Sequence, residues 1–241
     1  MKKYILAVAL LILVIAGLTF TWGPARNNEP EPVNSPEEII ELPEPDRGDE
    51  IMEDDVSIEK ALANRRSIRE YTDEPLPLEK LSQLLWAAQG ITDEPRGFRT
   101  APSAGALYPL ETYLIVNEVE TLDPGVYRFD PEAETLELHQ TGDFASELAA
   151  AALGQAWVRE APVNILFSAV YERIEPRYGE RAERYTDMEI GHAAQNIYLQ
   201  CESLGLGTVS VGAFDEDQTT SLLELPDDVV PRLLMPVGVT E

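Results

Sequence analysis

A run of 19 residues without a charged side chain, residues 4–22, constrains this chain before any other feature. As a helix rising about 1.5 Å per residue, the run would span roughly 30 Å, the thickness of a bilayer's hydrocarbon core. Lys2 and Lys3 precede it, and residues 18–22 offer no small-residue cleavage site. We therefore expect residues 1–24 to form an uncleaved membrane anchor, with a cleaved signal segment as the alternative.

The two lysines also predict the orientation of this anchor. Basic residues tend to stay on the cytoplasmic side of a membrane segment. The sequence thus predicts a single-pass protein of the cell membrane whose remaining part lies on the extracytoplasmic side. If the segment is cleaved, the same reasoning predicts a secreted protein.

Residues 25–56 are rich in Pro, Glu and Asp, and they carry twelve acidic groups against Arg26 and Arg47. Such a segment repels itself and buries little apolar surface, so we expect a disordered acidic linker. The net charge of the whole chain is −26, which argues against nucleic acid as a partner. Residues 57–241 remain as one domain with enough apolar residues for a core.

Helical and strand patterns alternate in this domain, which predicts an α+β fold. The spacing of apolar residues predicts one helix that begins at Ser57. It predicts four more helices over residues 78–89, 144–153, 181–204 and 216–223. Strand composition predicts a meander of 111–117, 125–130 and 135–139, a buried strand at 163–170, and strands at 208–214 and 232–237. Residues 92–101 are expected as a loop. The charged segment 171–185 is either a salt-bridged surface helix or a lid that faces a substrate.

Three arginines and a hydroxyl gather in residues 64–71, where the first helix of the domain ends: Arg65, Arg66, Ser67 and Arg69. Clustered guanidinium groups suit the oxygens of a phosphate, although a solvated helix end is the simpler alternative. Residues 101–109 and 205–214 are rich in small residues, so their backbone could lie against a planar ligand. No G-x-G-x-x-G follows a strand, which favours a mononucleotide flavin over a dinucleotide.

At these residues the chain resembles the nitroreductase-like flavoproteins. The opening motif is R-R-S-I-R-E-Y at 65–71. The SagB-type dehydrogenases are the most similar branch, through A-P-S-A-G-A-L-Y-P-L-E at 101–111, R-Y-G-E-R at 177–181, G-H-A-A-Q-N at 191–196 and G-L-G-T-V-S-V-G-A-F at 205–214. The resemblance implies a nitroreductase fold with a mixed central sheet wrapped by helices. It also implies FMN bound at the interface of a homodimer.

The resemblance assigns roles to particular residues. Arg65, Arg66, Ser67 and Arg69 would bind the FMN phosphate, ribityl chain and pyrimidine end. Pro102, Ser103 and Ala104 would come from the partner subunit, and Gly212 and Ala213 would place a backbone N–H near flavin N5. Arg177 and Tyr178 match a Lys-Tyr pair of the azoline-oxidising members. An arginine does not release its proton at ordinary pH, so general-base duty would fall to Tyr178 or to no residue, which makes azole formation doubtful.

The sequence therefore predicts a membrane-tethered FMN-dependent oxidoreductase acting on a small-molecule or peptide substrate. Two alternatives remain: an NAD(P)H-dependent reductase of nitroaromatics or quinones, and a flavin-binding module without turnover. No metal site is expected, because His139 and His192 have no carboxylate or cysteine at ligand spacing.

Overall fold

The computed structural model describes residues 38–48 and 56–241. The anchor predicted for residues 1–24 lies outside these ranges, so it stays a prediction. Among the described residues, no helix combines the length and the apolar character that crossing a membrane requires.

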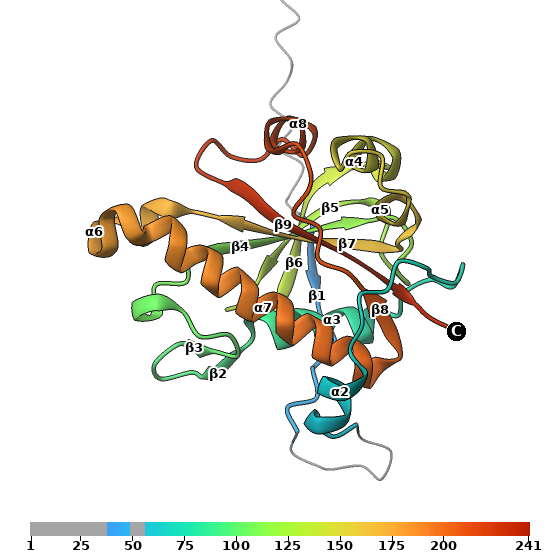
Figure 1. The fold of residues 1–241 in the computed structure, drawn as a ribbon, viewed down its shortest axis with the longest axis horizontal. Coiled ribbons are helices and arrows are strands. Elements are labelled where there is room, and N and C mark those ends of the chain that lie inside the picture. The colour runs from blue at the N-terminus through green and yellow to red at the C-terminus, as the bar shows by residue number, and fades with distance from the viewer. Residues whose placement is uncertain (1–37, 49–55) are drawn as a thin grey trace, which may run out of the picture. The chain divides into compact units, whose positions relative to one another are not determined.

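A seven-stranded sheet in the order β1-β6-β5-β4-β7-β9-β8 forms the centre of the domain (Figure 1). The prediction of a mixed sheet is wrong, because every ladder between its strands is antiparallel. Short turns join β4, β5 and β6 as the predicted meander, and such turns can connect only antiparallel neighbours. The strands are β1 (Ile39–Glu41), β4 (Leu110–Val116), β5 (Gly125–Asp130), β6 (Thr135–Thr141), β7 (Val163–Ala169), β8 (Leu206–Thr208) and β9 (Val230–Val239).

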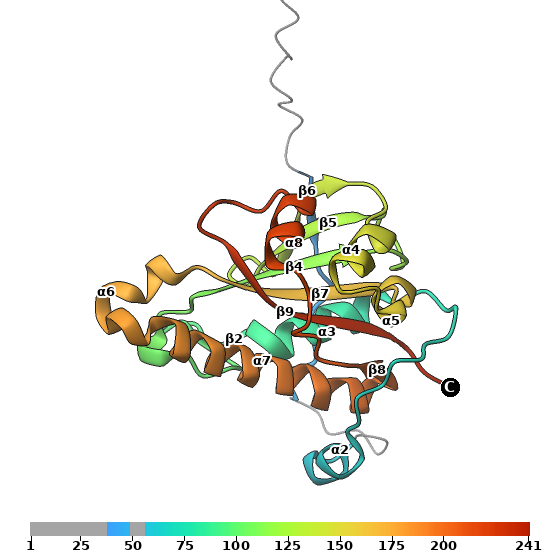
Figure 2. The ribbon, with the colours of Figure 1, turned by 45° about the horizontal axis from the view of Figure 1, so that its top comes forward.

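Helices cover both faces of the sheet, which explains why β4 and β7 are buried along their whole length. Leu114 and Val116 of β4 pack in the core that includes α3 and α7, whereas Tyr113 and Ile115 pack in the core that includes α4 and α5. Figure 2 shows α3 and α7 on one side of the sheet and α4 and α8 on the other. The helices are α2 (Ile58–Asn64), α3 (Leu78–Gln89), α4 (Ala145–Ala151), α5 (Ala156–Glu160), α6 (Glu175–Tyr178), α7 (Ala182–Leu204) and α8 (Glu216–Leu222).

Capping residues set the ends of the helices that position the candidate site. The Ser57 side chain accepts a hydrogen bond from the Lys60 N–H at the start of α2, as predicted. Gly90 ends α3, and a Cβ on it would lie only 2.2 Å from Trp86 Cδ1. Gly205 ends α7 in the left-handed conformation, with φ of 66°.

The structure differs from the sequence prediction near the start of the domain. Ile39–Glu41 were assigned to the acidic linker, but they form β1 and pair with β6. The Ser82 hydroxyl donates to the Pro43 carbonyl oxygen, and Arg47 forms an ion pair with Glu134. Ordered structure therefore includes residues 38–48, because two apolar residues, Ile40 and Leu42, pack against the core.

Three further segments differ from expectation. The loop predicted at 92–101 contains a small hairpin of β2 (Ile91–Asp93) and β3 (Phe98–Arg99). The strand predicted at 208–214 is limited to β8 plus an isolated bridge at Val211. Segment 171–185 forms two 3-10 turns, α6 and the start of α7, and its strongest ion pairs go to distant residues rather than along one helix.

Candidate functional site

The arginine segment lies directly against the segment 205–214. The Ile68 N–H donates to the Thr208 carbonyl oxygen at 2.9 Å. The Tyr198 hydroxyl of α7 accepts a hydrogen bond from the Ser210 N–H at 2.8 Å and lies 3.1 Å from Ser67 Oγ. Two motifs that are about 140 positions apart in the sequence thus meet at one place beside α7.

Tyr198 is polarised by its neighbours. Burial acts to raise the pKa of Tyr198, but the hydrogen bonds with Ser67 and Ser210 and the charge of Arg65 outweigh it and hold the pKa below its ordinary value. The Arg65 guanidinium lies 5.1 Å from the centre of the Tyr198 ring, a cation–π arrangement. The sequence reading missed Tyr198. Its position two residues after the G-H-A-A-Q-N motif, on the same helix, was the available signal.

The cations of this segment have no carboxylate partner among the described residues. Arg66 is exposed, and its Nη1 donates to three backbone carbonyls at the end of α2. Arg69 lies 5.2 Å from the centre of the Trp157 ring of α5. Three cations thus gather within five residues with no acidic side chain to neutralise them, although the chain has 44 acidic residues. They leave donors available for an anion from outside the chain.

Gly212 and Ala213 follow this junction on the way to α8, and both are exposed. The Ala213 carbonyl oxygen accepts a hydrogen bond from Gln155 Nε2 at 2.9 Å, which fixes the backbone there. Apart from its chain neighbours, no heavy atom of residues 38–48 and 56–241 lies within 4 Å of a Cβ built on Gly212. The backbone at Gly212 therefore faces open space, as a surface that supports a planar ligand requires.

Residues 101–109 lie at another part of α7, beside Arg177 and Tyr178. Pro102 is exposed, while Ser103 and Ala104 are partly buried. Gly105 has φ of 67°, and a Cβ on it would lie 2.8 Å from Arg177 Nη1 and 2.9 Å from the Tyr178 hydroxyl. The structure thus brings the A-P-S-A-G segment together with the predicted Arg177-Tyr178 pair.

Glu189 of α7 is a buried carboxylate that the sequence reading did not select. It is 1% exposed, and neither of its oxygens has a hydrogen-bond partner among the described residues. Burial raises the pKa of Glu189 to about 7, against the opposing effects of the nearby Ser103 hydroxyl and Arg99 guanidinium. A group with this pKa can hold or release a proton near neutral pH. The sequence reading missed Glu189 because the surrounding segment is rich in charged residues, as a solvent-exposed helix surface would be.

The two halves of the predicted site do not meet within one chain. Tyr198, at the arginine segment, and Glu189, at the A-P-S-A-G segment, are nine residues apart on α7. At about 1.5 Å per residue this separates them by roughly 13 Å along the helix axis. One chain therefore carries two separate halves of the predicted site. The cationic half consists of Arg65, Arg66, Ser67 and Arg69 with the exposed backbone at Gly212, and the other half lies farther along α7 and includes Arg177 and Tyr178.

The donor set of the cationic half fits the phosphate end of a mononucleotide flavin. Arg65, Arg66 and Arg69 supply the charge, and Ser67 supplies a hydroxyl. In the described part of the chain, no group of three His, Cys, Asp or Glu side chains could hold a metal ion. The donor chemistry thus favours an anionic organic group.

Comparison with known proteins places the chain in a family. The model of the nitroreductase family matches residues 62–239. The chain belongs to the nitroreductase family. It has the α+β fold of these flavin oxidoreductases, with a central antiparallel sheet between helices.

Relatives of this nitroreductase-family chain include MJ1384 of Methanocaldococcus jannaschii, itself named as a nitroreductase. The two are 48% identical over 185 residues, which cover 77% of this chain and 92% of the relative. The FMN reductase [NAD(P)H] of Bacillus subtilis is 30% identical over 193 residues, which cover 74% of this chain and 64% of that protein. A crystal structure from Ralstonia eutropha, also named as a nitroreductase, is 34% identical and superposes with a TM-score of 0.73. This match covers 84% of the present chain and 90% of the Ralstonia chain.

Proposed function

We propose that this protein is a membrane-tethered, FMN-dependent oxidoreductase of the SagB-type branch that works as a homodimer. The observation that carries the proposal is the group of three arginines, Arg65, Arg66 and Arg69, which have no carboxylate partner among the described residues of a strongly acidic chain. FMN, when bound, would accept two electrons as a hydride and pass them to an acceptor. The residues of this chain would bind FMN, orient it, and hold or take a proton.

The cationic half would hold the phosphate and the polar chain of FMN. Guanidinium groups bind phosphate oxygens bidentately, and the Arg65 guanidinium is already held over the Tyr198 ring. Ser67 is fixed by its contact with Tyr198, so its hydroxyl is positioned before any ligand arrives. The exposed backbone at Gly212 and Ala213 would support the planar ring.

The partner subunit would supply the second half. Pro102, Ser103 and Ala104 lie away from the arginine segment of the same chain, so we expect a second copy to bring them to it. Apolar side chains are available for such an interface: Ile58 and Leu62 of α2 are 60% and 56% exposed, and Met188 of α7 is 46% exposed. An i,i+4 apolar pair on an exposed helix is typical of a surface that another helix covers.

The proposed substrate is a small molecule or a peptide that gives two electrons to the flavin. Tyr178 would hold or take the proton that accompanies this step, while Arg177 would keep its charge at every relevant pH. The Arg177 guanidinium lies 5.5 Å from the centre of the Tyr178 ring, a cation–π arrangement that holds the two side chains together. The anchor predicted in residues 1–24 would place this chemistry at the extracytoplasmic face of the cell membrane.

Flavin binding by the purified full-length protein tests the proposal. We expect yellow protein that releases FMN on denaturation. The double variant Arg65→Ala/Arg66→Ala should bind FMN at least about tenfold more weakly, because charge-assisted contacts to phosphate are lost. Arg181→Ala/Arg184→Ala is the matched control, since both arginines are exposed and have no ion pair among the described residues. A colourless protein that takes up no added FMN contradicts the proposal.

Mixing two defective variants tests the shared site. Arg65→Ala/Arg66→Ala removes the cationic half, and Ser103→Trp blocks the half that the partner would supply. A mixed dimer would have one intact site, so mixing the variants should raise flavin binding above that of either variant alone. If mixing restores nothing while both variants still form dimers, the two halves do not come from different subunits.

A second candidate function is reduction of nitroaromatics or quinones with NAD(P)H. The similarity to the B. subtilis FMN reductase favours it. NADH or NADPH would then bleach the flavin absorbance under anaerobic conditions, and a quinone would restore it. A flavin that no acceptor reoxidises would instead indicate a binding module without turnover.

A further inference from the structure

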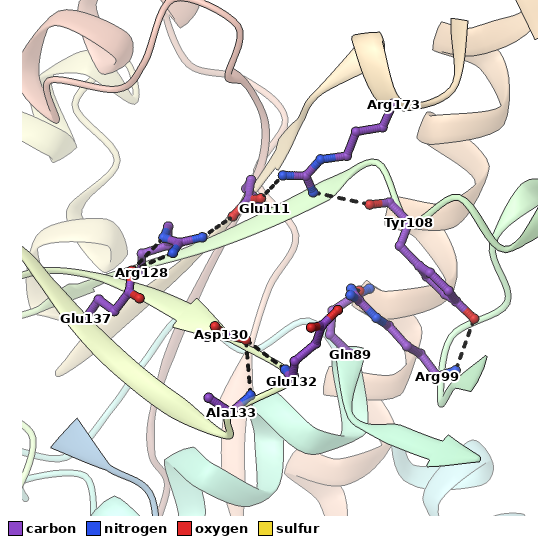
Figure 3. Close-up of polar contacts among 10 residues, drawn as sticks. All are labelled: Gln89, Arg99, Tyr108, Glu111, Arg128, Asp130, Glu132, Ala133, Glu137 and Arg173. Carbon is purple, nitrogen blue, oxygen red and sulfur yellow. Dashed lines mark hydrogen bonds and ion pairs between the residues drawn. The ribbon is translucent and has the colours of Figure 1, made fainter. Parts of the chain in front are cut away.

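A cavity of about 380 Å³ lies outside the predicted flavin site, between the end of α3, the β2–β3 hairpin and the strands β4 and β5. Figure 3 shows its polar side chains, with Arg99, Gln89, Tyr108 and the carboxylate of Glu132 grouped together and Arg128, Glu111 and Arg173 in a row across from them. The lining also includes Thr112 and four apolar residues, namely Leu107, Leu110, Phe129 and Pro131. The volume is within the range of small-molecule sites.

Two of the three arginines in the cavity are neutralised by the protein itself. Glu111 forms ion pairs with both Arg128 and Arg173. Glu137 adds a second carboxylate for Arg128. Asp130, also in the lining, accepts hydrogen bonds from the backbone N–H groups of a turn. These ion pairs and hydrogen bonds stabilise the wall of the cavity. Because they neutralise the charges of Arg128 and Arg173, these two arginines attract an anionic ligand only weakly.

Arg99 is different, because no carboxylate among the described residues lies within ion-pair distance of it. Its Nη1 donates to Gln89 Oε1 at 2.8 Å, and its guanidinium stacks 4.4 Å from the centre of the Tyr108 ring. Nε of Arg99 is buried and has no hydrogen-bond partner among the described residues. Burial lowers the pKa of Arg99, against the opposing effects of Tyr108 and of the nearby carboxylates of Glu189 and Glu132, neither of which forms an ion pair with it.

Gln89 gives a second, independent indication of a missing acceptor. Its side chain lines the cavity, and the residue is 2% exposed. Since Arg99 holds the Oε1 of Gln89, the amide nitrogen Nε2 must face elsewhere, and it has no partner among the described residues. Unpaired buried donors are uncommon in native proteins, so two adjacent ones indicate a place for an acceptor.

We propose that this cavity binds a small organic acid, whose carboxylate pairs with Arg99 and Gln89 and whose apolar body packs on Leu107, Leu110 and Phe129. A carboxylate is planar and has two acceptor oxygens, which suits a guanidinium fork beside an amide N–H₂. The site goes beyond the proposed function and does not depend on the flavin.

Benzoate and benzamide form a suitable pair of probes, because they have nearly the same shape and differ in charge. Calorimetric titration of the full-length protein should show binding of benzoate in the millimolar range or tighter, and at least about tenfold weaker binding of benzamide. Hydrogen exchange with benzoate present should show slower exchange in residues 98–111. Equal binding of the two probes, or no binding of benzoate, overturns the proposal.

Two arginines of the same hairpin provide the matched variants. Arg99→Met should weaken benzoate binding about tenfold or more, whereas Arg96→Met should leave it within about twofold, because Arg96 is exposed and already pairs with Asp93. If Arg99→Met fails to fold, the comparison of benzoate with benzamide on the unaltered protein still decides the question. Flavin absorbance in the same samples reports on the FMN site separately, so failure of one proposal is distinguishable from failure of the other.

Discussion

The Tyr198 hydroxyl lies 3.1 Å from Ser67 Oγ, and this contact joins the arginine segment to the longest helix of the domain. The same hydroxyl accepts the Ser210 N–H, so one side chain fixes two of the three segments assigned to the flavin. The geometry of the cationic half therefore depends on a residue outside all of the predicted binding motifs.

Tyr198→Phe should loosen this junction without unfolding the domain. The Ser210 N–H would lose its acceptor, and because Ser210 is exposed and water can replace the hydroxyl, this costs about 0.5–1.5 kcal/mol of the free energy of unfolding. FMN binding should weaken as well, because Ser67 and Arg65 would no longer be held in place. Denaturant titration and flavin fluorescence measure the two effects. Ser67→Ala serves as the control, because it keeps the Ser210 contact and should lose less stability than Tyr198→Phe.

Glu189 should make stability depend on pH in an uncommon direction. Its pKa is raised from 4.5 to about 7 in the folded protein. Between these values the folded state binds more protons than the unfolded state, so stability falls as pH rises and levels off above about pH 7. The loss attributable to this residue is about 3 kcal/mol at most, at 1.36 kcal/mol per pKa unit.

Glu189→Gln should remove this pH dependence and make the protein more stable than the wild type at pH 8. The difference between wild-type and variant unfolding free energies, measured at several pH values, isolates the contribution of Glu189 from the other acidic groups. Glu180→Gln is the control, because Glu180 is exposed and should leave the profile unchanged. An identical pH profile in Glu189→Gln and the wild type would show that the buried carboxylate does not titrate in this range.

Local patterns were sufficient to predict most of the fold. The meander of β4, β5 and β6 follows from short strands joined by turns, and α3 ends at Gly90 as its sequence predicts. Long-range pairing was not predictable. Ile39–Glu41 lie in a segment whose composition is that of a disordered linker, and only the pairing with β6 makes them a strand. The antiparallel arrangement of β7 and β9 is likewise set by tertiary contacts.

The sequence predicted those site residues that belong to a motif. It missed site residues that stand alone on a helix. Residues 65–71 and 205–214 stand out by their arginines and glycines, and the structure brings them together. Tyr198 and Glu189 belong to a helix whose other positions are core or surface residues. Which face of α7 each side chain occupies depends on how the helix packs on the sheet, and its sequence leaves that undetermined.

Gly105 and Gly97 allow a matched test of the Arg177-Tyr178 pair. Both have φ near 66°, so alanine at either position should cost roughly 1–2 kcal/mol of stability. A Cβ on Gly105 would also displace the ends of the Arg177 and Tyr178 side chains, whereas a Cβ on Gly97 would touch nothing within 4 Å. We expect the two variants to lose similar stability. Only Gly105→Ala should also show lower turnover. Equal turnover in the two variants would argue against a role for the pair.

Neighbouring isoleucines in β1 test whether the acidic segment is part of the domain. Ile40 is partly buried against the core, while Ile39 is 58% exposed. Ile40→Ala should therefore reduce the free energy of unfolding by about 1–2 kcal/mol, and Ile39→Ala by less than about 0.5 kcal/mol, because only the former exposes buried apolar surface. Denaturant titration of both variants measures the difference. If the two substitutions have the same small effect, β1 contributes nothing to stability in solution and the domain begins near Ser57.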